Sequence, residues 1–258
     1  MGYRLMSSHK QKHVLIDGDL LVYRSCSTKE VATAEECCNF FDNIMDKVLW
    51  DLQDFPNEEG YTVFLTGKDN FRKAIYPQYK ENRKTGDPWF PKWCRDHKEF
   101  RRTLGTVRDH AVNTFDAVVC NGYEADDGIS MAAHKYGYKN VIIASSDKDF
   151  KQIPCDIYNL YHWKLESVSK QEARKNLWMQ VLTGDTVDNI KGCQGIGKNK
   201  AAKLLAGCKT EEDYKKAVSD VYQEKEADME LNYHLVHLLR TQKEYETILE
   251  NYGLSSSS

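Results

Sequence analysis

The feature that most constrains the fold of this chain is an apolar run that ends in acids. Residues 141–145 are rich in β-branched side chains, and Asp147 and Asp149 follow directly. Such a run is typical of a strand buried on both faces, as in a parallel sheet. Residues 14–16 and 117–120 are two further short apolar runs. Because ligands of open α/β sheets bind beyond the carboxyl ends of the strands, whatever follows these runs should meet at one site.

Acids also follow the two other apolar runs. Asp17 and Asp19 come after the first, and Glu124, Asp126 and Asp127 come after the second. Carboxylates a few ångströms apart raise each other's pKa and disfavour ionisation, so a cluster of this size needs compensating cations. Oxygen ligands without sulfur favour Mg²⁺, Mn²⁺ or Ca²⁺ over zinc. We therefore predict a site for divalent cations, with Asp19 outside the ligand set or acting as a helix cap.

Strand and helix patterns alternate along most of the chain. Between residues 34 and 54 the apolar residues recur every three or four positions, which is typical of a helix packed on a sheet. Strands separated by helices favour a parallel sheet. We predict an α/β fold with a parallel sheet flanked by helices and a helical C-terminal part. The expected strands are 14–17, 61–66, 117–120, 141–145 and 157–161; the expected helices are 34–54, 124–136, 170–183, 198–206, 211–226 and 229–250.

The length of 258 residues allows one large domain, or one domain with an appendage. No apolar stretch approaches the roughly 20 residues needed to span a bilayer, and the N-terminus lacks the apolar segment of a secretory signal. We expect a soluble, intracellular protein without a membrane partner. The eight cysteines contain no Cys-x-x-Cys pair, which argues against zinc ribbons and favours reduced, packed thiols.

The net charge of −3 is unevenly distributed. The segment 71–102 holds ten Lys and Arg against four acids, so the rest of the chain is strongly acidic. A basic segment beside an acidic metal cluster suits a polyanionic substrate and metal-assisted chemistry. Its interleaved aromatic residues could stack on unpaired bases. The alternative is a solvated, partly helical face whose aromatic side chains belong to the core.

A glycine-rich turn precedes a lysine-rich helix near residue 198. Gly195-Ile196-Gly197-Lys198 leads into a helix that also carries Lys200 and Lys203. Glycines before a helix let backbone N–H groups approach a phosphate, and lysines would reinforce that contact. The alternative is a simple tight turn. Upstream, Asp185 and Asp188 lie three residues apart and would be neighbours on a helical turn.

In these segments the chain resembles the 5′-nuclease family: flap endonucleases, the 5′-nuclease domains of bacterial DNA polymerase I, and stand-alone phage 5′→3′ exonucleases. The resemblance covers residues 14 to about 206, with the motifs in family order. They are Asp17-Gly18-Asp19, Phe71-Arg72 with Tyr79-Lys80-Glu81-Asn82-Arg83, Gly122-Tyr123-Glu124-Ala125-Asp126-Asp127, Ser146-Asp147-Lys148-Asp149, and Leu182-Thr183-Gly184-Asp185 through Asp188-Asn189 to Gly195-Ile196-Gly197.

The resemblance implies a PIN-like nuclease core over residues 1–175, with a helical arch at about 71–106. Residues 176–258 would hold a helix–three-turn–helix that grips duplex DNA, at about 182–206, and further helices. It implies metal-dependent hydrolysis of phosphodiesters near 5′ ends of DNA, with two or more Mg²⁺ or Mn²⁺ ions, and K⁺ on backbone carbonyls of the three-turn element. The metal ligands would be Asp17, Glu124, Asp126, Asp127, Asp147, Asp149, Asp185 and Asp188.

The same resemblance assigns Lys80 and Arg83 to the scissile phosphate and counts Asp126 and Asp147 as catalytic. The more catalytic metal site would consist of Asp17, Glu124, Asp126, Asp127, Asp147 and Asp149, and Asp185 and Asp188 would complete the second. The residues expected to contact DNA are Arg72, Tyr79, Lys80, Arg83, Lys84, Gly195, Gly197, Lys198, Lys200 and Lys203. Independently of the family, two hard cations about 4 Å apart would activate a water and stabilise the leaving oxygen. Lys80 and Arg83 would then neutralise charge on the phosphate without acting as bases.

One family position differs. The strand at 61–66 should end in an acid, but Thr66-Gly67 follows, and the nearest acid is Asp69. Either Asp69 replaces the missing ligand, or the site works with one carboxylate fewer, which we favour.

Two other functions remain open: a non-catalytic DNA-junction binding protein of the same fold, and a 5′ ribonuclease that removes RNA primers from RNA–DNA hybrids. We expect a stand-alone, monomeric, phage-type enzyme. The sequence does not decide between exonuclease and flap-endonuclease preference.

Overall fold

A sheet of six strands in the order β3-β2-β1-β4-β5-β6 organises the computed structural model, which describes residues 11–27, 33–84, 97–224 and 228–254. Strands β1 to β5 pair in parallel, which confirms the predicted parallel sheet, and β6 runs antiparallel to β5. The sequence prediction lacks β6, because none of its residues is buried and it has no apolar run. The bounds are β1 (Lys12–Asp17), β2 (Pro56–Thr66), β3 (Val118–Cys120), β4 (Val141–Ala144), β5 (Asp156–Asn159) and β6 (Lys164–Ser167).

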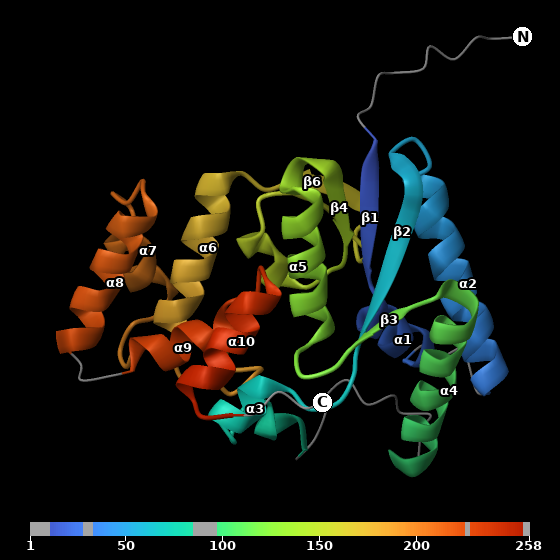
Figure 1. The fold of residues 1–258 in the computed structure, drawn as a ribbon, viewed down its shortest axis with the longest axis horizontal. Helices are drawn as coiled ribbons and strands as arrows, with labels where there is room; N and C mark the ends of the chain where they lie inside the picture. Colours follow the sequence, from blue (N-terminus) through green and yellow to red (C-terminus); the bar gives the residue numbers. More distant parts are fainter. Residues whose placement is uncertain (1–10, 28–32, 85–96, 225–227, 255–258) are drawn as a thin grey trace, which may run out of the picture.

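Alternating side chains of the strands supply a core on each face of the sheet. Val14 and Ile16 pack on the face covered by α1, α2 and α4, whereas Leu15 packs on the face covered by α5 (Figure 1). Burial on both faces explains why β1 reads as a continuous apolar run. Gly18 begins α1 close to β2, where a Cβ atom would lie 2.6 Å from the Phe64 carbonyl oxygen. The bounds are α1 (Gly18–Cys26), α2 (Ala34–Asp51), α4 (His97–Phe115) and α5 (Ala125–Tyr136).

Helices α6 to α9 pack around a second core at one end of the molecule (Figure 1). This core confirms the predicted helical C-terminal part. The expected boundary between residues 175 and 176 falls inside α6, so one continuous helix joins the two parts. The bounds are α6 (Lys170–Thr183), α7 (Lys198–Leu204), α8 (Glu211–Glu224) and α9 (Met229–Val236).

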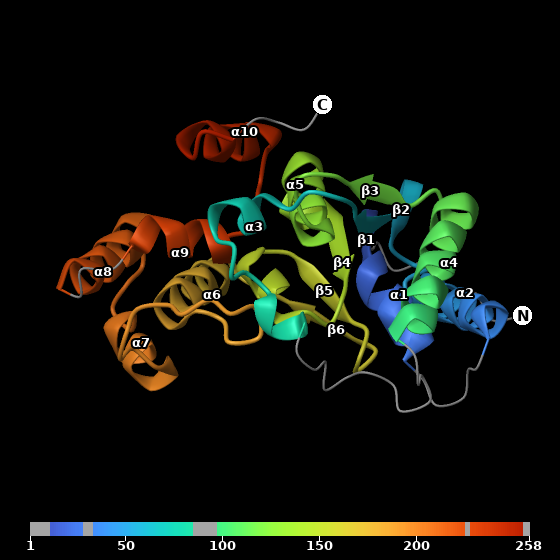
Figure 2. The same ribbon diagram turned by 90° about the horizontal axis from the view of Figure 1, so that it is seen from below.

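The single helix expected over 229–250 is wrong. Helix α9 ends at Val236, and α10 (Gln242–Asn251) begins after Thr241, whose side chain accepts a hydrogen bond from the Glu244 N–H. The break lets α10 pack against α3 (Phe71–Ile75) through an apolar cluster that includes Leu239 of the link between them. Helix α10 thereby lies on the opposite side of the molecule from α7 (Figure 2).

None of the helices within the described ranges is long and apolar enough to cross a membrane. The seven cysteines in these ranges are free thiols, and all except Cys38 are buried, as expected of packed thiols. Cys94 lies outside the described residues.

A buried ion pair between α3 and α5 also binds the backbone of the link between α9 and α10. The Arg72 guanidinium donates to both carboxylate oxygens of Asp127, at 2.6 and 2.8 Å, and also to the backbone carbonyls of Leu235 and His237. The Leu239 N–H donates to the same Asp127 carboxylate at 3.0 Å. Arg72 is 1% exposed and Asp127 is fully buried. The expectations that Arg72 contacts DNA and that Asp127 binds metal are therefore wrong, because each side chain is saturated by the other and by backbone.

We predict that Asp127→Ala lowers the free energy of unfolding by about 3–5 kcal/mol, because it leaves the Arg72 charge buried and unpaired. The double variant Arg72→Met/Asp127→Leu should lose less than either single variant, because no uncompensated charge remains. Urea unfolding at a constant m-value measures both. A loss under about 1 kcal/mol for Asp127→Ala would show that the pair does not hold the link to α5.

Candidate active site

A cavity of about 850 Å³ lies beyond the carboxyl ends of β1, β2 and β4. The structure brings together at this cavity seven of the eight predicted metal ligands, and Asp127 alone lies apart. Asp17 ends β1, Glu124 and Asp126 stand at the start of α5, and the other four follow β4 or α6. The acids that line the cavity are Asp17, Asp19, Glu124, Asp126, Asp147, Asp149, Asp185 and Asp188.

Ser145 orients two of these acids. Its hydroxyl donates to Asp17 Oδ2 at 2.7 Å and accepts from the Asp147 N–H at 3.0 Å. The other oxygen of Asp17 accepts from the Leu20 N–H at 3.0 Å and caps α1. Asp147 likewise accepts from the Asp149 N–H at 2.8 Å, so the chain turns immediately after β4. Local capping thus fixes both carboxylates at their strand ends.

Three carboxylates of the acidic cluster are compensated weakly or not at all, and the best placed of them, Asp149, lies 3.8 Å from Lys148 Nζ. Burial, reinforced by the charges of Asp19 and Asp147, raises the pKa of Asp17 to about 7 despite its hydrogen bonds. Burial, followed by the charge of Asp147, raises the pKa of Asp149 to about 7. Burial and the neighbouring carboxylates raise the pKa of Asp126 well above its ordinary value. Buried like charges of this kind are stabilised by a bound cation.

Two lysines pair with three other acids of the cluster, Glu124, Asp185 and Asp188. Lys80 Nζ lies 2.5 Å from Glu124 Oε1 and 3.7 Å from Asp188 Oδ2. Although burial alone would raise the pKa of Glu124, the charges of Lys80 and Arg72 lower it. Lys148 forms an ion pair with Asp185 and lowers the pKa of that carboxyl, again against the effect of burial.

The backbone around Lys80 is held by the turn that carries Asp185 and Asp188. Lys80 has a left-handed φ of 56°, and its N–H donates to the Asp188 carbonyl at 2.9 Å. The Asn82 side chain donates to the Thr186 carbonyl at 3.1 Å, and the Asn189 side chain donates to the Gln78 carbonyl at 2.9 Å. A non-glycine residue keeps this conformation only when its surroundings enforce it, so the position of the ammonium group is built into the fold.

The donor set fits hard divalent cations, because the cavity offers carboxylate oxygens without sulfur ligands. Within the described ranges, no three His, Cys, Asp or Glu side chains already form a ready ligand set. The lysine contacts account for this in part, since the ammonium groups of Lys80 and Lys148 hold Glu124 and Asp185. A cation entering the cavity would compete with those ammonium groups for carboxylate oxygens.

A guanidinium lies at the end of β2, where the family pattern has an acid. Arg108 Nη1 donates to Asp19 Oδ1 at 2.5 Å, and Nη2 donates to the Thr66 carbonyl. Asp19 Oδ2 accepts from the Thr66 N–H at 2.9 Å, so Asp19 supports the strand end. Sequence reasoning missed Arg108, because it is one of several basic residues on its helix and no local motif marks it.

Asp69 is not among the residues that line the acidic cavity, and it is exposed. This placement favours the alternative in which the site has one carboxylate fewer. Gly67 could not carry the missing acid, because a Cβ atom there would lie 2.7 Å from the Cys120 carbonyl oxygen and would clash with the Asn121 side chain. Thr66 lines the cavity instead, and its hydroxyl accepts from the Ala125 N–H at 2.8 Å.

The residues expected to contact DNA divide into buried and exposed sets. Tyr79 is 4% exposed, and its hydroxyl donates to Glu124 Oε2 at 2.9 Å, so it positions a carboxylate and the expected DNA contact is wrong. Phe71 and Phe100 are also buried and cannot stack on bases. Lys198, Lys200, Lys203, Gly195 and Gly197 are exposed on or before α7.

The remaining predicted residues lie largely outside the described part. Arg83 and Lys84 belong to a 3-10 turn (Glu81–Lys84) that continues from Lys80. Their side chains, and residues 85–96 of the expected arch, lie outside what the structure describes. Helix α4 begins at His97 and continues to Phe115, beyond the expected end of the arch at 106.

The turn between α6 and α7 depends on a glycine pair that sequence reasoning overlooked. A Cβ atom on Gly184 would lie 2.5 Å from the Gly192 N, and both residues have positive φ. Asp185 and Ile190 exchange backbone hydrogen bonds of 2.9 and 2.7 Å across the same turn. Gly195 also has a positive φ, whereas Gly197 has an ordinary φ of −87°.

The comparison with known families agrees with this geometry. The family described as "5′-3′ exonuclease, N-terminal resolvase-like domain" matches residues 12–180, and the chain belongs to this family. The 5′-3′ exonuclease of Buchnera aphidicola is 26% identical over 216 residues, which cover 76% of this chain and 70% of that protein. The flap endonuclease Xni of Shewanella frigidimarina is 32% identical over 154 residues, covering 55% of this chain and 56% of that protein.

The thermostable DNA polymerase I of Thermus aquaticus is 29% identical over 216 residues, but the matched part spans only 24% of that polymerase. Among solved structures, the D15 protein of phage T5, crystallised with metal ions, has a TM-score of 0.65 at 15% identity. The match covers 94% of this chain and 97% of that one. The D15 flap endonuclease of bacteriophage T5 in a complex with DNA and metal ions has a TM-score of 0.64 at 16% identity. These structures share the fold.

Asp126 and Asp127 offer a matched test of the geometry. We predict that Asp126→Asn weakens Mn²⁺ binding by about tenfold or more, because Asp126 faces the acidic cavity and ligand charge tunes affinity for hard cations. Asp127→Asn should leave Mn²⁺ affinity of the folded protein unchanged while lowering its unfolding free energy. Calorimetric Mn²⁺ titration and urea unfolding measure the two effects. Equal loss of Mn²⁺ affinity in both variants would contradict the placement of Asp127 outside the site.

Proposed function

We propose that this protein is a divalent-metal-dependent 5′→3′ exonuclease and flap endonuclease that hydrolyses phosphodiesters near 5′ ends of DNA. The observation that carries the proposal is the cavity beyond the strand ends that eight carboxylates and Lys80 line together. Membership in the 5′-3′ exonuclease family supports it. Two of the similar proteins, Xni and the DNA-bound D15 protein, are flap endonucleases, which supports the same activity here.

Asp17, Glu124, Asp126, Asp147 and Asp149 would hold one divalent ion, and Asp185 and Asp188 would complete the site of the second. Bound Mg²⁺ or Mn²⁺ would activate water and stabilise the leaving oxygen at phosphorus. Ser145 keeps Asp17 and Asp147 in place, and Gln180 does the same for Asp149 by donating to it at 2.5 Å. The fold thus presents carboxylates preorganised before substrate arrives, which lowers the reorganisation needed in the transition state.

Lys80 would turn its ammonium group away from Glu124 and toward the scissile phosphate, because Glu124 is one of the carboxylates that would hold a divalent ion. Arg83, which follows on the same turn, would assist at the phosphate. Arg108 lines the same cavity, pairs with Asp19, and would screen the acidic cluster from the approaching DNA backbone.

Lys198, Lys200 and Lys203 would contact the duplex backbone away from the metals, and K⁺ would bind backbone carbonyls of the turn between α6 and α7. We also propose that the enzyme is a monomer that acts inside the cell, where its DNA substrate is found. RNA at the 5′ end of RNA–DNA hybrids is a further substrate to test. Product sizing on 5′-labelled flap, nicked and blunt duplexes would separate exonucleolytic from flap cleavage.

We predict that Asp147→Asn nearly abolishes cleavage in Mg²⁺ while DNA binding persists, because removal of a carboxylate weakens metal binding but lessens repulsion of phosphate. Gel-shift titration in Ca²⁺ and single-turnover cleavage in Mg²⁺ measure the two effects. Asp220→Asn on the exposed side of α8 removes the same charge and should cleave normally. Cleavage by Asp147→Asn at the wild-type rate would refute the assignment.

A second prediction distinguishes residues that act in cleavage from residues that bind the duplex. Lys80→Ala should lower the single-turnover rate by about 10²–10³-fold with little change in Kd, because a charge aimed at the reacting phosphate acts mainly in the transition state. Lys200→Ala should instead weaken duplex binding and flatten its dependence on salt. Rate and Kd measured at several salt concentrations test both variants. If both substitutions change rate and Kd alike, the proposed division of roles is wrong.

A further inference from the structure

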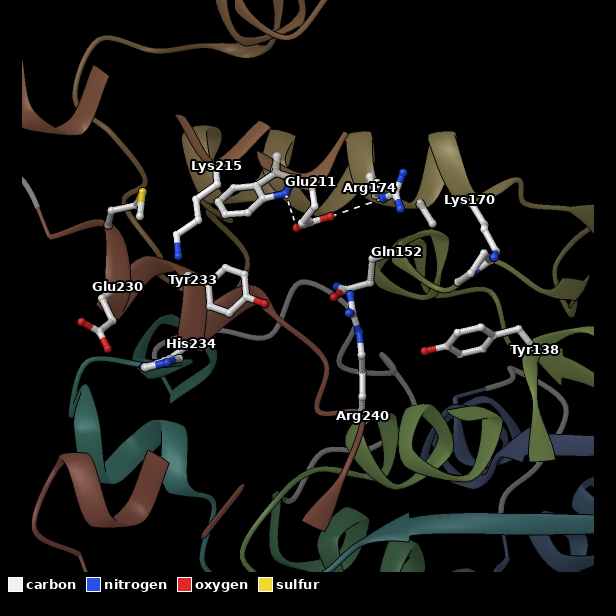
Figure 3. Close-up of a pocket in the computed structure, with 14 residues that line it drawn as sticks. Tyr138, Gln152, Lys170, Arg174, Glu211, Lys215, Glu230, Tyr233, His234 and Arg240 are labelled. Atoms are coloured by element: carbon white, nitrogen blue, oxygen red, sulfur yellow. Dashed lines mark hydrogen bonds and ion pairs between the residues drawn. The ribbon is translucent and has the colours of Figure 1, made fainter. Parts of the chain in front are cut away.

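A second cavity, of about 790 Å³, opens between α6, α8, α9 and the link from α9 to α10 (Figure 3). It shares no lining residue with the acidic cavity. Two glutamines separate the cavities: Gln152 lines the second cavity and donates to Gln180 at 3.3 Å, and Gln180 contacts Asp149. The second cavity is therefore a distinct site, on the far side of these side chains from the carboxylates.

The charges around this cavity favour an anion. Four cationic side chains line it, against Glu211 and Glu230. Glu211 is already neutralised, because it accepts from the Trp178 indole N–H at 2.8 Å and pairs with Arg174 at 3.4 Å. The other three cations, Lys170, Lys215 and Arg240, form no ion pair with any residue that the structure describes. They come from three different elements and leave the cavity with a net positive charge.

The cavity also has an aromatic wall. The Tyr233 ring stacks on His237 with centroids 4.8 Å apart and packs against Trp178 at 5.5 Å, which fixes its orientation. Tyr138 and Arg240 point into the cavity from the side opposite α6 (Figure 3). A cavity with fixed aromatic rings and a cationic rim suits a ligand with a planar ring and a phosphate.

We propose that this cavity binds a nucleoside 5′-phosphate, either free or as the unpaired end of a nucleic-acid strand. Arg240 would meet the phosphate with its planar, bidentate guanidinium, and Lys215 would add a second positive charge from α8. The base would lie against Tyr138 and the edge of Tyr233. A volume of about 790 Å³ exceeds what inorganic phosphate fills and falls in the range of small-ligand pockets.

The test is calorimetric titration of the full-length protein with deoxyadenosine 5′-monophosphate in EDTA, which removes divalent metal from the acidic cavity. Arg240→Gln should weaken binding by about tenfold, the effect of one lost charge-assisted contact. Lys243→Gln removes the same charge three residues later, from an exposed position outside the cavity, and should bind like the wild type. Because binding is measured without metal or cleavage, the result is independent of the proposed nuclease activity.

Lys215→Gln serves as a second variant, because Lys215 is exposed and its loss does not threaten the fold. It should also weaken binding, whereas Lys80→Ala should not. A 5′-phosphorylated oligodeoxyadenylate that binds more tightly than the mononucleotide, through Arg240, would assign the cavity to strand ends, and equal affinity would assign it to free nucleotide. The proposal is overturned if the mononucleotide does not bind, if inorganic phosphate or an oligoglutamate peptide binds as well, or if Lys80→Ala alone removes binding.

Discussion

The buried pair of Arg72 and Asp127 sets the geometry on which the rest of the structure depends. Arg72 lies eight residues before Lys80, and Asp127 directly follows Asp126 on α5. Their two hydrogen bonds therefore fix the lysine segment relative to the carboxylates of α5. The same guanidinium binds two carbonyls around the end of α9, so the C-terminal helices are tied to the same point. Burying an ion pair costs desolvation energy, but removing one partner costs more, because the other charge is left buried and unpaired. The pair therefore holds the elements around the site in fixed positions.

The pKa values of the carboxylates in the acidic cavity differ according to their neighbours. Burial and neighbouring carboxylates raise the pKa values of Asp17 and Asp126, whereas Glu124 and Asp185, whose side-chain oxygens contact a lysine, have lowered pKa values. The lysines thus stabilise half of the cluster, and the other half has the charge and oxygen chemistry that suit a divalent cation.

Much of the fold could be predicted from sequence, because both faces of β1 and β4 are buried and leave continuous apolar runs. The break after Val236 could not be predicted, because residues 229–250 have a helical composition throughout. The carbonyls at the break are bound by Arg72, about 160 residues earlier in the sequence. Convergence of the acids followed from parallel strands ending at one edge. The separation of Asp126 from Asp127 did not, because adjacent helical residues point about 100° apart and the sequence does not show which one faces the cavity.

The end of β2 differs in charge from the family pattern. Where the family pattern has a carboxylate, this chain has Thr66, and Arg108 donates to the Thr66 carbonyl and to Asp19. Replacement of an anion by a neutral side chain, with a cation beside it, makes this wall of the cavity more positive. Metal affinity should suffer, because hard cations depend on ligand charge. Phosphate attraction should gain, because the net charge that repels DNA falls. If the cavity binds metal and DNA as proposed, the change at Thr66 would weaken the binding of metal and strengthen the binding of DNA.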